Sequence, residues 1–322
     1  GICLSDFDQD GLLDIYFSNG GPSKNPKDRR NKLYHNRGNM VFEERAAEFG
    51  IDDSNHSTQS SFFDYDNDGD LDLFVCNHNI TFRMPHSALS KQLEIKENLK
   101  AGSSTLYRND GTKFTDVTES AGLLAHGYGL GVITADINKD GLVDIYQSND
   151  FTVPDFMYIN NGDGTFTDEL NSRTNQVSWF GMGVDIQDIN NDGHPELAVL
   201  DMAPSDHIDS KTMMASMNPG NFKMMVTDLG YQNQYMFNAL QLNDGEGNFR
   251  NIANYSGTAK TDWSWAGLFS DFDLDGSMEY FISNGYRRNN GDNDFKIKMA
   301  TARSAKGGFP AERREEAYNW MP

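Results

Sequence analysis

The chain has 322 residues and a formal net charge of −21, from 27 Lys and Arg against 48 Asp and Glu. This balance excludes a broad surface that neutralises nucleic-acid phosphates, and no apolar run approaches the roughly 18 residues that a transmembrane segment needs. Because aromatic residues make up 12% of the chain and there are 30 glycines, the composition favours an aromatic, turn-rich, all-β protein over a disordered one.

A nine-residue acidic motif recurs five times along the chain, with the pattern D-x-[DN]-x-D-G-x-x-[DE]. The copies begin at Asp6, Asp64, Asp136, Asp188 and Asp271. Between the copies a second element recurs, at residues 33–38, 106–111, 157–162 and, in a looser form, 240–245. Each ends in an Asn-x-Gly turn and is followed by a Phe. Such turns between short apolar runs predict tight hairpins, because Asn, Asp and Gly tolerate a positive φ.

Short strands are expected on both sides of each acidic loop. Motif positions 8 and 10 are mostly apolar, and this alternation predicts a half-buried strand that leaves the loop. The residues before the loop, such as 131–135 and 266–270, are rich in small side chains, which suits a crowded central channel. Each unit therefore reads as strand, acidic loop, strand, connection, strand, turn and strand. Repetition of four antiparallel strands at intervals of roughly 50–80 residues predicts the blades of a β-propeller.

Oxygen ligands are predicted to converge in each acidic loop. Side chains at positions 1, 3 and 5 point inward because Gly at position 6 permits a sharp turn. Position 7 would offer its backbone carbonyl, and the acid at position 9 would close the shell. Ligation by oxygen alone, in a flexible shell, favours Ca²⁺ over Mg²⁺. The candidate ligands for up to five Ca²⁺ are Asp6, Asp8, Asp10, Leu12, Asp14, Asp64, Asp66, Asp68, Asp70, Asp72, Asp136, Asn138, Asp140, Leu142, Asp144, Asp188, Asn190, Asp192, His194, Glu196, Asp271, Asp273, Asp275, Ser277 and Glu279.

Two other interpretations of the acidic loops are less favoured. An EF-hand shares the first six positions, but it requires a Glu at position 12 and flanking helices. The flanks here are predicted strands, and no copy has Glu at position 12. The residues at that position are Phe17, Val75, Gln147, Val199 and Ile282. Acidic surface turns without metal are disfavoured by electrostatics, because three or four carboxylates a few Å apart repel by several kcal/mol.

The repeats resemble a known family. The loops and their flanking strands, with residues 61–74 as the clearest copy, are similar to the FG-GAP/VCBS calcium repeats of integrin α-subunit propellers. The segments 181–185, 199–202 and 262–265 resemble bacterial VCBS-repeat proteins related to cartilage acidic protein. The resemblance implies a seven-bladed propeller with Ca²⁺ sites on one face, an extracytoplasmic location, and a role in adhesion or in binding glycan or protein. It implies no catalytic residue in this chain.

The predicted propeller spans residues 1–300. We expect blades at about 1–45, 57–118, 127–170, 177–253 and 262–285, with insertions at 79–101 and 201–235. Because the fifth unit lacks its hairpin, we expect the five loops to belong to a seven-bladed ring whose natural chain began before Gly1 and continues beyond Pro322. A closed five-bladed ring is the alternative. Residues 301–322 are expected to be a helical insertion or the start of a continuing segment.

Further elements carry open alternatives. Helices are expected at Ser87–Leu99 and near Ala311–Asn319. Aromatic residues at the first strands are expected in the blade cores, with sugar stacking as the alternative; they are Trp179, Phe180, Trp263 and Trp265. A methionine cluster is expected to form a local core, with an adaptable partner surface as the alternative; it comprises Met202, Met213, Met214, Met217, Met224 and Met225. Two cysteines, Cys3 and Cys76, are either buried thiols or one disulfide bridge.

The function expected from these patterns is that of a secreted or cell-surface, bacterial, Ca²⁺-stabilised module that binds protein or glycan without catalysis. The first alternative is a polysaccharide-active enzyme of the lyase type, for which His126, Tyr128 and Arg83 are the candidate residues. The second alternative is a structural subunit of a larger assembly in the cell envelope.

Overall fold

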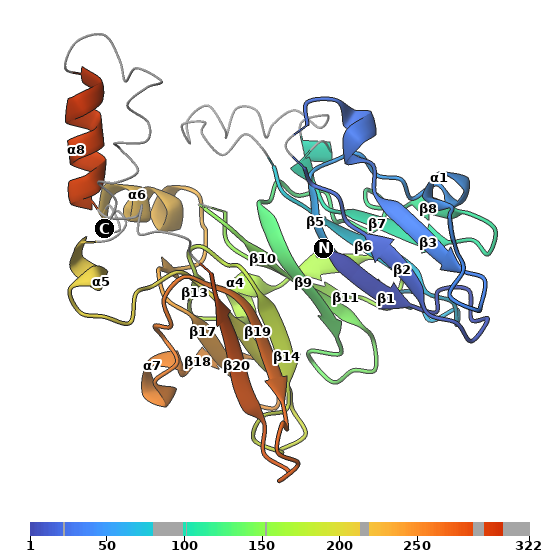
Figure 1. Ribbon diagram of the computed structural model, residues 1–322. Helices are drawn as coiled ribbons and strands as arrows, with labels where there is room; N and C mark the ends of the chain where they lie inside the picture. The colour runs from blue at the N-terminus through green and yellow to red at the C-terminus, as the bar shows by residue number, and fades with distance from the viewer. Residues whose placement is uncertain are drawn as a thin grey trace.

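The computed structural model describes residues 1–21, 23–79, 99–100, 102–151, 153–212, 219–285 and 293–304. Within these ranges, the prediction of an all-β protein with four-stranded antiparallel units is confirmed for the first four units (Figure 1). Their strands are β1 (Ile2–Ser5), β2 (Asp14–Phe17), β3 (Lys32–Asn36) and β4 (Phe42–Glu44); β5 (Ser57–Phe63), β6 (Asp72–Asn77), β7 (Thr105–Asn109) and β8 (Phe114–Asp116); β9 (Gly129–Ala135), β10 (Asp144–Asn149), β11 (Phe156–Asn160) and β12 (Phe166–Asp168); and β14 (Val184–Gln187), β15 (Glu196–Val199), β17 (Ala239–Asn243) and β18 (Phe249–Asn251).

Each sheet follows the order of the chain, because each strand pairs with the next through a loop or a turn. The first pairing in every unit closes around the acidic loop, as Ser5 opposite Asp14 illustrates. The last pairing closes around the Asn-x-Gly turn, with Asn36 opposite Phe42. The fifth unit contributes only β19 (Ser264–Ser270) and β20 (Glu279–Asn284) to its described sheet, which agrees with the missing hairpin in the sequence.

The hydrophobic core lies between successive sheets. One cluster joins Phe7 and Leu33 of the first unit to Leu73 and Phe114 of the second. Three further clusters join the second unit to the third, the third to the fourth, and the fourth to the fifth. A sheet with neighbours on both sides buries both faces, so β6, β10 and β15 are buried along their whole length. The expectation that the strand after the loop is half-buried is therefore wrong for these three strands.

The first strands of the five units lie side by side in chain order, β1 against β5, β5 against β9, β9 against β14 and β14 against β19. They surround a cavity of about 430 Å³ to which all five units contribute, with lining residues that include Gly1, Thr58, Leu130, Val184 and Ala266. The approach is close: a Cβ on Gly183 would lie 2.4 Å from the carbonyl oxygen of Trp265. Small residues are needed here because a larger side chain has no space.

The fifth sheet exposes apolar side chains that the other sheets bury. Ten residues after the first Asp of the motif, Phe281 of the fifth unit is 56% exposed. The equivalent residues of the first four units are at most 1% exposed: Tyr16, Phe74, Tyr146 and Ala198. Trp265 is 47% exposed, so its expected place in a blade core is wrong. The physical reason is that no further sheet of the described structure packs on this outward face. Trp179 is buried as expected, and Trp263 is half-buried.

Short helices and a parallel pair of strands complete the described structure. The pair is formed by β13 (Val177–Ser178) and β16 (Gln234–Tyr235). The helices are η1 (Pro26–Arg29), α1 (Ala46–Phe49), α4 (Leu170–Arg173), α5 (Asp209–Thr212), α6 (Pro219–Lys223), η2 (Met224–Asp228), α7 (Ala253–Ser256) and α8 (Asn293–Ser304). The sequence did not predict α8. None of the helices in the described ranges combines the length and apolar character that crossing a membrane requires.

Several sequence predictions fall on residues outside the described ranges. These are the helix near 311–319, all but the last residue of the helix at 87–99, the lyase candidate Arg83, and Met213, Met214 and Met217. In the described part of the 201–235 insertion, Met202 and Met225 are buried. This burial fits a local core. Cys3 and Cys76 are free thiols, the first half-buried and the second buried, so there is no bridge between them.

Candidate metal centres

The five acidic loops share one hydrogen-bonding pattern. The carboxylate at position 1 accepts hydrogen bonds from the backbone N–H groups of positions 5 and 6; Asp6 accepts them from Asp10 and Gly11, each at 2.9 Å. The carboxylate at position 5 accepts one from the N–H of position 7, which for Asp10 is Leu12 at 2.9 Å. The equivalent bonds in the other loops measure 2.8–3.2 Å. Each loop therefore turns its carboxylates around one centre.

Two residues in every loop adopt a left-handed backbone. The Gly at position 6 has φ between 87° and 96°, which agrees with the predicted sharp turn. Position 4 also has a positive φ, between 58° and 63°, although its residues differ chemically: Gln9, Asn67, Lys139, Asn191 and Leu274. A left-handed conformation costs a residue with a Cβ roughly 1–2 kcal/mol. Because such different residues share it, the loop geometry dictates the conformation.

The acid at position 9 ties the acidic loop to the hairpin. Asp72 is fully buried and accepts hydrogen bonds from the backbone N–H of Tyr65 in its loop, at 3.0 Å, and of Asn109 in its hairpin, at 2.8 Å. Asp144 holds the same two positions of the third unit, with both bonds at 2.8 Å. Position 9 thus has a structural role that the sequence prediction, which treated it only as a ligand, did not include.

Carboxylate oxygens from positions 1, 3 and 9 lie within 4.8 Å of one another in three of the loops, the first, second and fifth. In the first and second loops, an independent observation supports a missing positive partner. Oδ2 of Asp14, Oδ1 of Asp66 and Oδ1 of Asp70 are buried and have no hydrogen-bond partner within the described structure. Leaving a buried carboxylate oxygen without a partner costs free energy. A hard divalent cation among these oxygens would supply the partner, so the residues present fit Ca²⁺.

The second loop carries the densest negative charge. Burial, and then the charges of Asp68, Asp66 and Asp64, raise the pKa of Asp70 to about 6. The charges of these three residues thus act on the side chain of Asp70, whereas the sequence prediction used only its backbone carbonyl. Burial raises the pKa of Asp72 to about 7, although its two N–H donors oppose the shift. A bound cation would favour the ionised forms and lower both values.

The third and fourth loops differ because position 3 is an amide. Nδ2 of Asn138 donates to Oδ2 of Asp140 at 2.9 Å, and Nδ2 of Asn190 donates to Oδ2 of Asp192 at 2.9 Å. The amide N–H₂ groups thus partly satisfy carboxylates that would otherwise repel one another. These loops have three carboxylates at the ligand positions, so they need a cation less than the second loop does.

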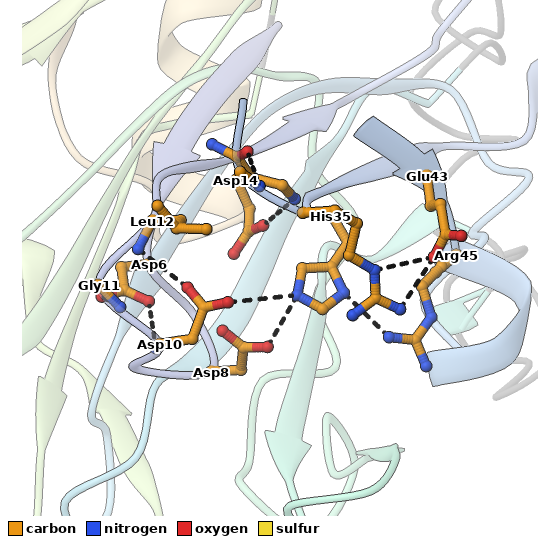
Figure 2. Close-up of polar contacts among 12 residues, drawn as sticks. Asp6, Asp8, Asp10, Gly11, Leu12, Asp14, His35, Glu43 and Arg45 are labelled. Carbon is orange, nitrogen blue, oxygen red and sulfur yellow. Dashed lines mark hydrogen bonds and ion pairs between the residues drawn. The ribbon is translucent and has the colours of Figure 1, made fainter. Parts of the chain in front are cut away.

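The first loop has an additional neighbour, His35 on β3 (Figure 2). Its side chain is buried, and its Nε2 lies 2.9 Å from Oδ2 of Asp8 and 3.9 Å from Oδ2 of Asp10. On the other side of the ring, Nη1 of Arg45 lies 2.9 Å from Nδ1. The sequence analysis did not single out this contact. One feature of the sequence could have predicted it. The residue before the hairpin Asn is His in the first unit, whereas it is Arg, Ile or Leu in the other hairpins.

The acidic loops of neighbouring units lie on the same rim of the structure. Nε2 of Gln9 donates to the carbonyl of Gly69 in the second loop, at 2.6 Å. Nδ2 of Asn191 donates to the carbonyl of Gly276 in the fifth loop, at 3.1 Å. These two bonds join the first loop to the second and the fourth loop to the fifth.

At the end of each unit opposite the acidic loop, polar side chains form another recurring set of hydrogen bonds, which we call the polar clasp. The sequence patterns did not predict it. Five residues after position 9, every unit has an amide or a carboxylate: Asn19, Asn77, Asn149, Asp201 and Asn284. In the second, third and fifth units this side chain accepts a hydrogen bond from the first residue of the first strand or the residue just before it, and in the fourth unit from the N–H of Trp179 after β13, at 2.8–3.0 Å. In the first four units its backbone N–H donates to a polar side chain ahead of the third strand. The constant spacing of five residues after position 9 is the feature of the sequence that could have predicted this set of hydrogen bonds.

One member of this clasp predicts a pH dependence of stability. Asp155 is fully buried and accepts hydrogen bonds from the Tyr146 hydroxyl at 2.6 Å and the Asn149 N–H at 2.8 Å. Burial raises its pKa from 3.8 to about 7. The folded state therefore holds a proton that the unfolded state has lost between these values. The stabilisation that this proton gives the folded state is complete below pH 3.8. We expect the free energy of unfolding to fall by about 4 kcal/mol, through Asp155 alone, as the pH rises to about 7.

An Asp155→Asn variant isolates this group, because its amide cannot ionise and still offers an oxygen to the Asn149 N–H. Urea unfolding of both proteins across that pH range, in EDTA, should show a steeper loss of stability with pH for the wild type than for the variant. Identical pH slopes would show that Asp155 does not titrate on unfolding.

The described residues proposed for lyase chemistry are packed in the protein. His126 and Tyr128 are both buried, with ring centroids 5.0 Å apart in an edge-to-face arrangement. Burial lowers the pKa of His126. His126 also borders a cavity of about 230 Å³ with Val153, Phe156 and Tyr231. Tyr128 belongs to the hydrophobic core between the second and third units, and His126 packs against it.

A family model described as an FG-GAP-like repeat matches residues 6–75 and 149–199, which include the first, second and fourth acidic loops. Among curated proteins, Cartilage acidic protein 1 of Xenopus tropicalis is 26% identical over 203 residues. The alignment covers 61% of this chain and 30% of that protein, so the chain spans less than a third of the length of this relative. The predicted resemblance to FG-GAP/VCBS repeats is confirmed by both findings.

Three solved structures are distantly similar. A lectin of Agrocybe aegerita, described as recognising non-reducing terminal N-acetylglucosamine, has a TM-score of 0.45 at 16% identity, over 91% of this chain and 63% of the lectin. The biofilm matrix protein Bap1 of V. cholerae has a TM-score of 0.34 at 14% identity, over 63% and 24%. The rhamnogalacturonan lyase PL11 of Bacillus licheniformis has a TM-score of 0.40 at 12% identity, over 88% and 43%. Likenesses this distant do not support an argument about this chain.

Proposed function

We propose that this chain, which carries FG-GAP-like repeats, is a calcium-stabilised β-propeller module that acts outside the cell by binding a protein or glycan. The observation that carries the calcium part is the set of buried, unpartnered carboxylate oxygens in the first two loops, on Asp14, Asp66 and Asp70. The extracellular part rests on the acidic repeats and on a relative named for cartilage.

The residues that would hold Ca²⁺ are the carboxylates and amides at positions 1, 3, 5 and 9, with the backbone carbonyl at position 7. When bound, the cation would supply positive charge between groups that otherwise repel. We expect the second loop to bind most tightly, because Asp70 adds a carboxylate to its four others. The third and fourth loops should bind most weakly, because Asn138 and Asn190 already hydrogen-bond their neighbours.

We also propose that the sheets belong to a closed ring of blades, of which seven is the number implied by the family resemblance. The inner strands of the five units surround one cavity. Phe281 is exposed at a position that the next sheet covers in each of the first four units. A further sheet packed against β19 and β20 would bury it.

Isothermal titration of metal-free protein with Ca²⁺ tests the metal part. We expect several sites, the tightest of which is lost in an Asp66→Asn, Asp70→Asn double variant that keeps the loop backbone. The matched control is Asp110→Asn together with Asp163→Asn, which removes two exposed hairpin carboxylates from outside the loops. If Ca²⁺ gave the same binding heat with the double variant as with the wild type, the metal assignment would be contradicted.

A glycan array and a pull-down from extracellular matrix fractions, each with Ca²⁺ and with EDTA, test the binding part. We expect retention of a ligand that depends on Ca²⁺ and no formation of unsaturated products from acidic polysaccharides. Release of such products would favour the lyase alternative. Retention of no glycan and no protein under either condition would contradict the binding function while leaving the calcium sites intact.

A further inference from the structure

We propose that Arg45 holds His35 in the tautomer with its proton on Nε2, so that His35 positions Asp8 and withholds a nitrogen ligand from the first acidic loop. His35 is then a residue that determines the metal specificity of this loop. The inference rests on the proposed calcium site there and extends it to the choice of cation.

The imidazole ring lies between the acidic loop and the start of α1 (Figure 2). The His35 residue is 3% exposed. Its Nε2 faces Asp8 at 2.9 Å and Asp10 at 3.9 Å, and its Nδ1 faces Nη1 of Arg45 at 2.9 Å. Because the ring is buried, its two nitrogens face these three side chains rather than bulk water.

The guanidinium determines which ring nitrogen carries the proton. Arginine has five N–H donors and no acceptor, so Nδ1 of His35 must accept from Arg45. A neutral imidazole that accepts at Nδ1 carries its hydrogen on Nε2. That nitrogen lies 2.9 Å from Oδ2 of Asp8 and 3.9 Å from Oδ2 of Asp10, but it forms no aligned hydrogen bond with either. Its attraction to Asp8 and Asp10 is therefore mainly electrostatic, and a cation held by these carboxylates would meet an N–H rather than a lone pair.

Arg45 is itself held in place by residues of α1. Its Nε donates to Oε2 of Glu48 at 2.8 Å and its Nη2 donates to Oε1 at 2.5 Å. Its Cζ also lies 4.7 Å from the centre of the Phe49 ring. Two carboxylate bonds and one aromatic face fix the guanidinium, so the proton position on His35 is set by the fold.

The consequence is a choice between two classes of cation. Imidazole nitrogen favours Zn²⁺ and Co²⁺, whereas an all-oxygen shell favours Ca²⁺. Asp8, Asp10 and His35 place one potential ligand atom each within 4.8 Å of the others. If Arg45 is removed, Nδ1 can take the proton and Nε2 can offer its lone pair to the same centre. An Arg45→Met variant should therefore gain a site for transition metals that the wild type lacks.

The tautomer can be measured directly in the metal-free full chain. Long-range proton–nitrogen NMR of protein labelled with ¹⁵N-histidine distinguishes a protonated from an unprotonated ring nitrogen, and a His35→Gln variant identifies the signal. We expect Nε2 to be protonated and Nδ1 unprotonated in the wild type. A wild-type ring with an unprotonated Nε2 would overturn the proposal, whether or not the Arg45→Met variant folds.

Visible absorption of Co²⁺ tests the specificity. We expect the Arg45→Met variant to bind Co²⁺ at least about tenfold more tightly than the wild type, and His35→Gln in the same background to abolish this gain. An Arg108→Met variant is the matched control, because Arg108 precedes the hairpin Asn of the second unit and has no His beside it. A His35-dependent Co²⁺ spectrum in the wild type, or no gain in a folded Arg45→Met variant, would overturn the proposal.

Failure of the proposed function would have a different signature. Loss of Ca²⁺ binding by the wild type in calorimetry would contradict the calcium site, while the NMR signals would still report the position of the proton on His35.

Discussion

Removal of calcium is expected to lower the melting temperature by more than about 10 °C. Each site that binds only the folded state contributes about 2.7 kcal/mol when Ca²⁺ is present at 100 times the dissociation constant. In a chain of this size 1 kcal/mol corresponds to roughly 2–4 °C, and several loops act together. Chelation also leaves the charges of Asp64, Asp66 and Asp70 close together without a cation to neutralise them. Thermal unfolding with millimolar Ca²⁺ and with excess EDTA measures the difference.

Two controls separate a bound ion from general charge screening. NaCl at matched ionic strength should recover only part of the lost stability, because it screens exposed charges and does not fill a site. Mg²⁺ should be less effective than Ca²⁺, since it demands a stricter octahedral shell. An unchanged melting temperature in EDTA would contradict the calcium argument, as would full recovery by NaCl alone.

Replacement of Asp72 by Ala is expected to be the most destabilising single substitution in an acidic loop, even without metal. Asp72 is fully buried and accepts the backbone N–H groups of Tyr65 and Asn109. Each buried donor left without an acceptor costs roughly 1–3 kcal/mol, so the variant should lose about 2–6 kcal/mol. Urea unfolding in EDTA measures this loss without a contribution from Ca²⁺.

Matched variants divide the two roles of this carboxylate. Asp72→Asn keeps one acceptor oxygen and should lose about half as much stability in EDTA, while it weakens Ca²⁺ binding at the second loop. Asp163→Ala, at an exposed hairpin position that bonds only Thr165, should leave the fold almost unaffected. Stability of Asp72→Ala equal to that of the wild type in EDTA would mean that Asp72 serves the metal alone.

The repeated local signals made much of the architecture predictable. The Gly at position 6 and the Asn-x-Gly turns mark loops whose backbone conformation depends on a few neighbouring residues. The two-stranded form of the fifth unit's described sheet also agrees with the sequence, because a hairpin requires turn residues that the fifth repeat lacks. The family resemblance rests on the same short motifs.

Other features depended on what lies beside each strand. The apolar alternation after each loop suggested one buried face, but β6, β10 and β15 are buried on both because sheets pack on either side of them. Trp265 and Phe281 are exposed for the opposite reason, since no described sheet packs on the outward face of the fifth sheet. Packing between units is non-local, so periodicity within one strand cannot report it.

The sequence alone determined the repeating unit, its acidic loops and the carboxylate and amide oxygens that they present, because these depend on residue types at fixed short spacings. Only the tertiary structure decided which carboxylates also hold the backbone together, and which side chains from elsewhere approach the loops. Asp72 joins a loop to a hairpin 37 residues away, and His35 joins Asp8 to Arg45. Such contacts follow from how strands pair and pack in space, and no local pattern encodes the distance between them.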